Sequence, residues 1–172
     1  MSIEVMMELA SWEDPRFELP DGYAFAPFPD DGRAIWTAIQ NATGTYGVID
    51  ATLFDREFGS NADEHRERIF FVEHRGMPVG VSAAWHAGPR APAGAQRLHW
   101  LAVMPDHQRR GLGRLLVLET LRRFRALGAN RAYLTTGSEN RRAIALYRRI
   151  GFLPAPRDDP EARAWEALAD HT

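Results

Sequence analysis

The chain lacks two residue types that carry much of protein chemistry. Its 172 residues include no cysteine, and its 21 basic residues are all arginine, so lysine is absent as well. The first absence excludes disulfides, thiolate metal ligands and a cysteine acyl-enzyme intermediate, and the second excludes Schiff-base chemistry. The sequence also has no G-x-S-x-G segment for a serine nucleophile. Covalent catalysis is therefore not expected.

Long apolar runs and a strong net charge are missing too. No stretch approaches the roughly 20 apolar residues that span a bilayer, and residues 1–8 lack the basic and apolar regions of an export signal. The formal net charge is −2, which argues against a broad nucleic-acid or membrane footprint. We therefore expect a cytoplasmic protein with no nucleic-acid and no membrane partner. A length of 172 residues lies in the usual size range of one domain, and a hydrophobic fraction of 45% suffices for a continuous core, so we expect a single domain over residues 1–172.

The most informative segment that is present covers residues 108–113. It reads Gln-Arg-Arg-Gly-Leu-Gly, between an apolar run that ends at Val103 and a long helical pattern. Unpaired backbone N–H groups and the positive end of the helix dipole favour an anion at such a helix start. Glycine also lets the backbone adopt positive φ and lets a diphosphate approach closely. The segment predicts a phosphate-bearing ligand, although alone it is equally compatible with a tight turn and solvated arginines.

Hydrophobic periodicity predicts alternating strands and helices. Strands are expected at residues 23–26, 69–73, 79–85, 98–103 and 132–135, and from 152 onward. Helices are expected after Asp30 or Asp31, at 113–127 with Gly128 as the cap, at 140–150 before Gly151, and from Pro160 with Asp159 as the cap. Residues 1–20 are expected to be irregular, and 44–63 are uncertain apart from a short helix around Phe54. This order predicts an α/β (α+β) fold, in which a mixed central sheet carries helices on both faces.

Two motifs in this order resemble one known family. The pattern Q-x-x-G-x-G at 108–113 resembles the acyl-CoA pyrophosphate loop of the GCN5-related N-acetyltransferases, the GNAT superfamily. A later signature of that family is matched by Asn140, Ala143, the run Ala145-Leu146-Tyr147, and Gly151-Phe152. The resemblance covers about residues 21–155, with 1–20 as an N-terminal extension and 156–172 as a C-terminal tail. It implies the GNAT fold, in which two parallel strands, here 98–103 and 131–135, splay apart around the acyl-CoA.

The resemblance also implies how acetyl-CoA would be held as the co-substrate, without a metal. Backbone amides that lack a strand partner in the splay would pair with the pantetheine arm, and one of them could stabilise an oxyanion. Asn140 would hydrogen-bond the pantetheine, although asparagine is equally suited to a helix cap. The implied cofactor-binding residues are Leu101, Ala102, Val103, Gln108, Arg109, Arg110, Gly111, Leu112, Gly113, Arg114, Asn140 and Ala143.

Two side chains are candidates for proton transfer. The family commonly uses a tyrosine at the position of Tyr147 to protonate the leaving thiolate, and a phenol of pKa about 10 is a donor at neutral pH. The alternative for Tyr147 is a core role, because it lies on the apolar stripe of its helix. Many members carry a carboxylate that acts as the base on the strand before the loop. This chain has His99 there, and in this it resembles the aralkylamine acetyltransferases, where histidine occupies this strand. His99 is a candidate base, and a structural histidine is the alternative. Glu73, His74 and His86 are weaker candidates, and His65, His107 and His171 are expected at the surface.

The resemblance predicts an acetyl-CoA-dependent N-acetyltransferase that works by direct attack in a ternary complex. The acceptor would be a small-molecule amine or a peptide N-terminus, and a homodimer is compatible with the family. The alternative function is a non-catalytic acyl-CoA sensor, because the strand carboxylate is missing. Nucleic-acid binding by Arg122, Arg123 and Arg125 is disfavoured, because these residues form the polar face of an amphipathic helix.

Overall fold

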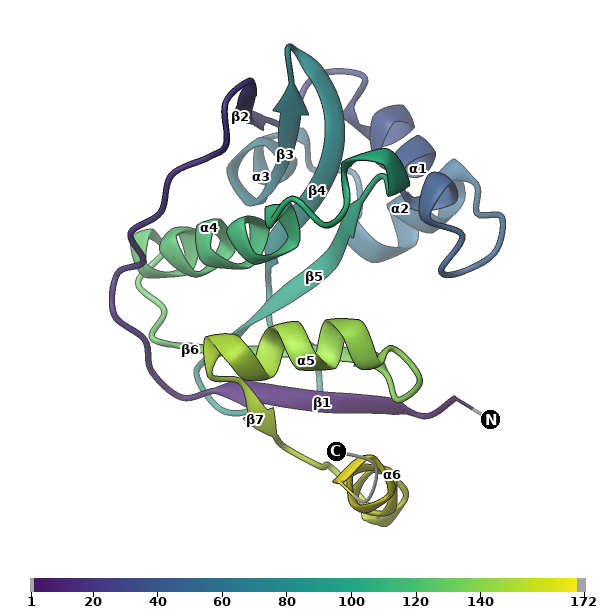
Figure 1. Cartoon of the computed structure of the whole chain (residues 1–172), viewed down its shortest axis with the longest axis vertical. Helices are drawn as coiled ribbons and strands as arrows, with labels where there is room; N and C mark the ends of the chain where they lie inside the picture. Colours follow the sequence, from purple (N-terminus) through teal and green to yellow (C-terminus); the bar gives the residue numbers. More distant parts are fainter. Residues whose placement is uncertain (1, 170–172) are drawn as a thin grey trace.

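The computed structural model describes residues 2–169 and places the strands in one mixed sheet (Figure 1). The strands are β1 (Glu4–Leu9), β2 (Tyr23–Pro27), β3 (Ile69–His74), β4 (Met77–Trp85), β5 (Ala95–Val103), β6 (Arg131–Gly137) and β7 (Leu153–Pro154). Their order across the sheet is β2-β3-β4-β5-β6-β1-β7. Within the described residues, β5 and β6 are the only parallel neighbours. The predicted mixed sheet is confirmed.

Helices cover both faces of this sheet, as predicted. They are α1 (Gly32–Thr43), α2 (Ala51–Phe58), α3 (Ala62–Arg68), α4 (Leu112–Ala126), α5 (Arg141–Ile150) and α6 (Asp159–Ala169), with a short 3-10 helix η1 (Pro105–His107) before α4. Trp36 of α1 and Phe54 of α2 pack in one buried cluster with side chains of β3, β4 and β5. Val117 of α4 and Ile144 of α5 pack in another cluster on the opposite face. Figure 1 shows α4 and α5 on one side of the sheet and α1 to α3 on the other.

Strand β1 corrects the expectation that residues 1–20 are irregular. It lies between β6 and β7 and is antiparallel to both. Val5 and Met7 are fully buried beneath α5, and Met6 packs on the opposite face with Tyr133. A strand that is buried on both faces shows no alternation of polar and apolar residues, so the sequence pattern did not reveal it.

Two smaller expectations are also wrong. His65 is buried rather than exposed, because its ring packs on Phe54 and its Nε2 donates to the carbonyl of Phe58 at 3.1 Å. The cap of α6 is Asp158 rather than Asp159, since Asp158 Oδ1 accepts from the Glu161 amide at 3.1 Å. His171 lies outside the described residues, as do residues 170–172 of the expected C-terminal tail.

The helix ends agree better with the sequence. Gly128 and Gly151 follow α4 and α5 with φ of 79° and 114°, a conformation that favours glycine. Helix α4 begins at Leu112, one residue before the expected start. None of the helices within the described residues is long and apolar enough to cross a membrane.

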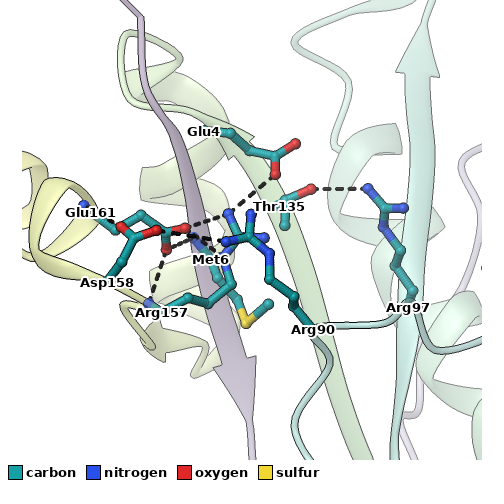
Figure 2. A network of polar contacts seen from close by, with 8 residues as sticks. All are labelled: Glu4, Met6, Arg90, Arg97, Thr135, Arg157, Asp158 and Glu161. Carbon is teal, nitrogen blue, oxygen red and sulfur yellow. Dashed lines mark hydrogen bonds and ion pairs between the residues drawn. The ribbon is translucent and has the colours of Figure 1, made fainter.

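A buried carboxylate ties the C-terminal helix to the sheet (Figure 2). Glu161 of α6 is 3% exposed, and its Oε2 accepts from the Met6 amide of β1 at 3.3 Å. Its other oxygen pairs with Arg157, whose guanidinium also reaches Glu4 at 3.1 Å. Strand β7 pairs with β1 over two residues, so Glu161 supplies an acceptor beyond that short ladder.

We expect Glu161→Ala to destabilise the fold by about 3 kcal/mol, because breaking this buried ion pair leaves the Met6 amide without its acceptor and leaves Arg157 with only the exposed Glu4. Glu166→Ala is the matched control, since Glu166 is exposed on the same helix, and it should change the free energy of unfolding by less than about 0.5 kcal/mol. Urea denaturation measures both. Equal, small losses would contradict the role given to Glu161.

Candidate functional site

The parallel strands β5 and β6 separate after three residue pairs. They pair at Ala95↔Arg131, Gln96↔Ala132 and Arg97↔Tyr133, and no pair follows. Strand β5 stays paired with β4 as far as Val103, and β6 stays paired with β1 as far as Gly137. Figure 1 shows β5 running diagonally away from β6 and β1. The edges of residues 98–103 and 134–137 that face each other are therefore open, and their backbone groups are free to pair with a ligand.

A bulge in β5 lies inside this splay. Trp100 has φ of 50°, which is unusual for a bulky residue, and the register between β4 and β5 shifts beside it. As a result, His99 and Trp100 both reach the α1–α2 face, where each donates to Oε2 of Glu57 on α2, at 2.9 and 3.0 Å. Gln40 of α1 supports the bulge by donating to the Trp100 carbonyl at 3.0 Å.

Glu57 is a site residue that the sequence reasoning missed. It lies in the segment whose structure was uncertain, but it stands three residues after Phe54, on the inward side of α2. The hydrogen bond from His99 is the main cause that lowers the pKa of Glu57 from 4.5 to about 2, and burial opposes it. Burial lowers the pKa of His99 below 6.5, and the hydrogen bond to Glu57 opposes that. At neutral pH the pair is therefore an anionic carboxylate and a neutral imidazole.

The hydrogen bonds also assign the imidazole tautomer. A carboxylate only accepts, so Nε2 of His99 carries the proton that it shares with Glu57. Nδ1 has no hydrogen-bond partner among residues 2–169 and keeps its lone pair. His99 is 6% exposed and packs on Phe58. It is thus held in one orientation, with one nitrogen able to accept a proton.

Tyr147 approaches the splay from the other face. It is 7% exposed and belongs to the buried cluster of α4 and α5 that includes Leu98 and Leu134. Burial is the main cause that raises the pKa of Tyr147, and nearby Tyr46 adds to it. Its hydroxyl makes no hydrogen bond within the described part of the chain. Tyr147 is therefore both a core residue and a protonated donor whose hydrogen is not committed elsewhere.

The loop before α4 has the geometry of an anion cradle. Gly111 has φ of 81° and Arg109 has φ of 63°. The N–H groups of residues 109–114 donate to no acceptor within the described chain, and Gln108 anchors the loop by donating to the Val103 carbonyl at 2.9 Å. The side chains of Arg109, Arg110 and Arg114 are exposed, whereas Leu112 is buried in the core. Leu112 can contribute its backbone only.

The remaining cofactor candidates lie along the same opening. The side chains of Leu101 and Val103 pack on the α4 side, whereas Ala102 packs against the α1–α2 cluster. Asn140 caps α5, since its Oδ1 accepts from the Ala143 amide at 3.3 Å, and this occupies the Ala143 N–H. The side-chain amide nitrogen of Asn140, Nδ2, has no partner among the described residues, so capping leaves it free for a ligand.

The weaker candidates lie apart from the splay. His86 pairs with Glu64 of α3, and His74 packs on Tyr23 of β2. Residues 2–169 contain no group of three or more His, Asp or Glu side chains arranged to hold a metal ion.

Comparison with known proteins gives a consistent result. The sequence model of the acetyltransferase (GNAT) family matches residues 10–152. Mycothiol acetyltransferase from Streptomyces avermitilis is 30% identical over 141 residues, which cover 78% of this chain and 44% of that protein. Such curated relatives match most of this chain, but the chain spans only about half of their length.

Solved structures share the fold. A GCN5-related N-acetyltransferase from Sphaerobacter thermophilus superposes with a TM-score of 0.72 at 21% identity, over 89% of this chain and 48% of that one. YncA from Salmonella typhimurium, solved with its cofactor acetyl-CoA, has a TM-score of 0.61 at 16% identity, over 81% of this chain and 96% of that one.

The Glu57 carboxylate gives the fold a distinct pH dependence. Because its pKa falls from 4.5 to about 2 on folding, the unfolded chain takes up this proton first as the pH drops. The stabilisation is complete above pH 4.5 and is lost between pH 4.5 and 2. Glu57→Gln should thus lower the unfolding temperature at pH 7, and the difference from the wild type should shrink toward pH 3. Asp55→Asn, in an exposed ion pair of α2, should have little effect. A pH-independent difference for Glu57→Gln would contradict the assignment.

Proposed function

Because the chain belongs to the GNAT family of acetyltransferases, we propose that it transfers an acetyl group from acetyl-CoA to a primary amine. The observation that carries this proposal is the opening between β5 and β6, which ends at a loop of free N–H groups. Acetyl-CoA would supply the acetyl group as an activated thioester. The amine would attack it directly in a ternary complex, because the chain offers neither a cysteine nor a G-x-S-x-G serine for a covalent step.

The residues along the opening fit acetyl-CoA. The free N–H groups of 109–114 and the exposed guanidinium groups of Arg109, Arg110 and Arg114 suit a diphosphate. The unpaired edge of residues 101–103 and the free amide nitrogen of Asn140 suit the two amide groups of a pantetheine arm. A backbone N–H of that edge can also stabilise the negative charge that develops on a thioester oxygen under attack.

Proton transfer divides between the two faces of the sheet. On the α1–α2 face, Nδ1 of His99 accepts a proton from the amine, directly or through a water, while Glu57 fixes the ring and stabilises the imidazolium that results. On the α5 face, the Tyr147 hydroxyl donates a proton to the leaving thiolate. The two groups therefore serve opposite ends of the reacting centre without competing for the same proton.

The Glu57–His99 pair also favours an enzyme over the alternative acyl-CoA sensor. The sensor hypothesis rests on the missing strand carboxylate, and in this fold a carboxylate from α2 reaches the same strand. We propose an acceptor that is a small-molecule amine or a peptide N-terminus.

The cofactor loop is tested by two glycines at opposite ends of α4. Gly111 and Gly128 have φ of 81° and 79°, and at neither position would an added Cβ meet another atom within 4 Å. Alanine at either position should cost a similar free energy of unfolding, about 1 kcal/mol. Gly111→Ala should also weaken CoA binding at least about 10-fold, because it disturbs charge-assisted N–H contacts, whereas Gly128→Ala should bind CoA normally. Calorimetric titration measures both, and equal affinities would refute the loop assignment.

Two further variants separate the proton-transfer roles. Tyr147→Phe and His99→Gln should keep the CoA affinity and lower kcat by about 100-fold or more. Wild-type kcat/KM should fall at acidic pH with an apparent pKa below 6.5, because burial keeps His99 neutral to lower pH than usual. This acidic limb should disappear in His99→Gln and persist in Tyr147→Phe. Thiol release measured from pH 5 to 9 decides, and a kcat near that of the wild type in either variant removes that residue from the mechanism.

A further inference from the structure

One arginine beside the proposed reaction centre has no acidic partner. Three other arginines lie near strands β1 and β6, and each is paired with a carboxylate. The pairs are Arg131 with Glu8, Arg157 with Glu4 and Glu161, and Arg90 with Asp158. No described ion pair includes Arg97 of β5. Figure 2 shows Arg97 on β5, apart from Arg90 and Arg157 and joined to Thr135 of β6.

Arg97 reaches across the splay but uses few of its donors. Its Nη2 donates to Thr135 Oγ1 of β6 at 3.0 Å. Its Nε is buried and has no hydrogen-bond partner within residues 2–169. A buried guanidinium donor without an acceptor costs free energy, and a bound ion is one of the ways in which a protein satisfies such a group. Because Arg97 also lacks a carboxylate partner and borders the open splay, its donors point to an anionic ligand.

The position of Arg97 fixes where that anion would lie. Arg97 and His99 are two residues apart on the same face of β5, roughly 7 Å along the strand. Besides burial, which is the main cause, the charge of Arg97 lowers the pKa of His99. An amine held at His99 would thus have its neighbouring atoms within reach of the guanidinium.

We propose that Arg97 binds a carboxylate of the acceptor that lies within a few bonds of the reacting amine, so that the acceptor is a free amino acid or a similar zwitterion. This inference rests on the proposed function. Nη2 donates one hydrogen to Thr135, and its second hydrogen lies beside Nη1, so these two nitrogens form a planar pair of donors that a carboxylate can accept. Glu57 and Glu4, whose negative charges act on His99, attract the ammonium end, while Arg97 attracts the anionic end. The site would select small molecules over peptide N-termini, because the carboxyl group of a peptide's first residue forms an uncharged amide bond.

The test compares acceptors that differ only at the carboxylate. Phenylalanine, phenylalaninamide and 2-phenylethylamine form one such series, and alanine with alaninamide forms another. The wild type should favour the carboxylate form about 10- to 100-fold in kcat/KM, the range that corresponds to a charged hydrogen-bonded pair. Arg97→Gln should bring this ratio close to 1. Arg90→Gln, which removes a partnered guanidinium nearby, should keep the wild-type ratio.

Binding of the same series to the CoA complex, measured by calorimetry, separates this inference from the proposed function. A carboxylate preference in binding that Arg97→Gln abolishes, with no acetyl transfer, would support the role of Arg97 and contradict the proposed activity. If the wild type acetylates amines but shows equal kcat/KM for the carboxylate and amide forms, the proposed activity would be supported and the role of Arg97 contradicted. The wild-type ratios decide even if Arg97→Gln fails to fold.

Discussion

The loss of pairing between β5 and β6 beyond Arg97 is the constraint on which the rest of the site depends. Both strands keep their outer partners, so the sheet stays continuous while its centre opens. The opening supplies unpaired backbone groups, and it is the place where side chains of both faces can meet one reacting centre. The site also depends on the bulge at Trp100, because the bulge turns both His99 and Trp100 toward Glu57. Backbone geometry, more than any single side chain, makes this region a site.

The two faces of the sheet then carry different chemistry. The α4–α5 face presents the cradle of free N–H groups, the cap residue Asn140 and a protonated Tyr147, which together suit an anionic cofactor and a leaving thiolate. The α1–α2 face presents charged side chains, with Glu57 ionised and His99 neutral at physiological pH. In the proposed mechanism, such a division keeps the general acid away from the general base. The proposed contact between Arg97 and the acceptor carboxylate would place acceptor specificity outside the cofactor motif.

Local signals in the sequence were sufficient for part of this structure. The long helices were predictable because their apolar spacing is regular and glycines mark their ends, and the 108–113 loop was predictable because two glycines and a following helix limit its conformation. Strand β1 was not, since burial on both faces removes alternation. Glu57 was missed because its helix has only eight residues, too few for the sequence to establish a helical period. The bulge has no local signal, because tryptophan does not favour positive φ; it depends on the contacts that Gln40 and Glu57 make from distant segments.

The central claim, that the splay and the loop before α4 together hold the cofactor through backbone N–H groups, is tested most directly by amide hydrogen exchange. The amides of 109–114 have no acceptor among residues 2–169, and those of 101–103 that point away from β4 face the open splay, so both sets should exchange rapidly in the free chain. On addition of CoA, protection should rise within 101–103 and 109–114, and β1 and the outer strands should change little. Binding of CoA without protection in these two segments would contradict the account.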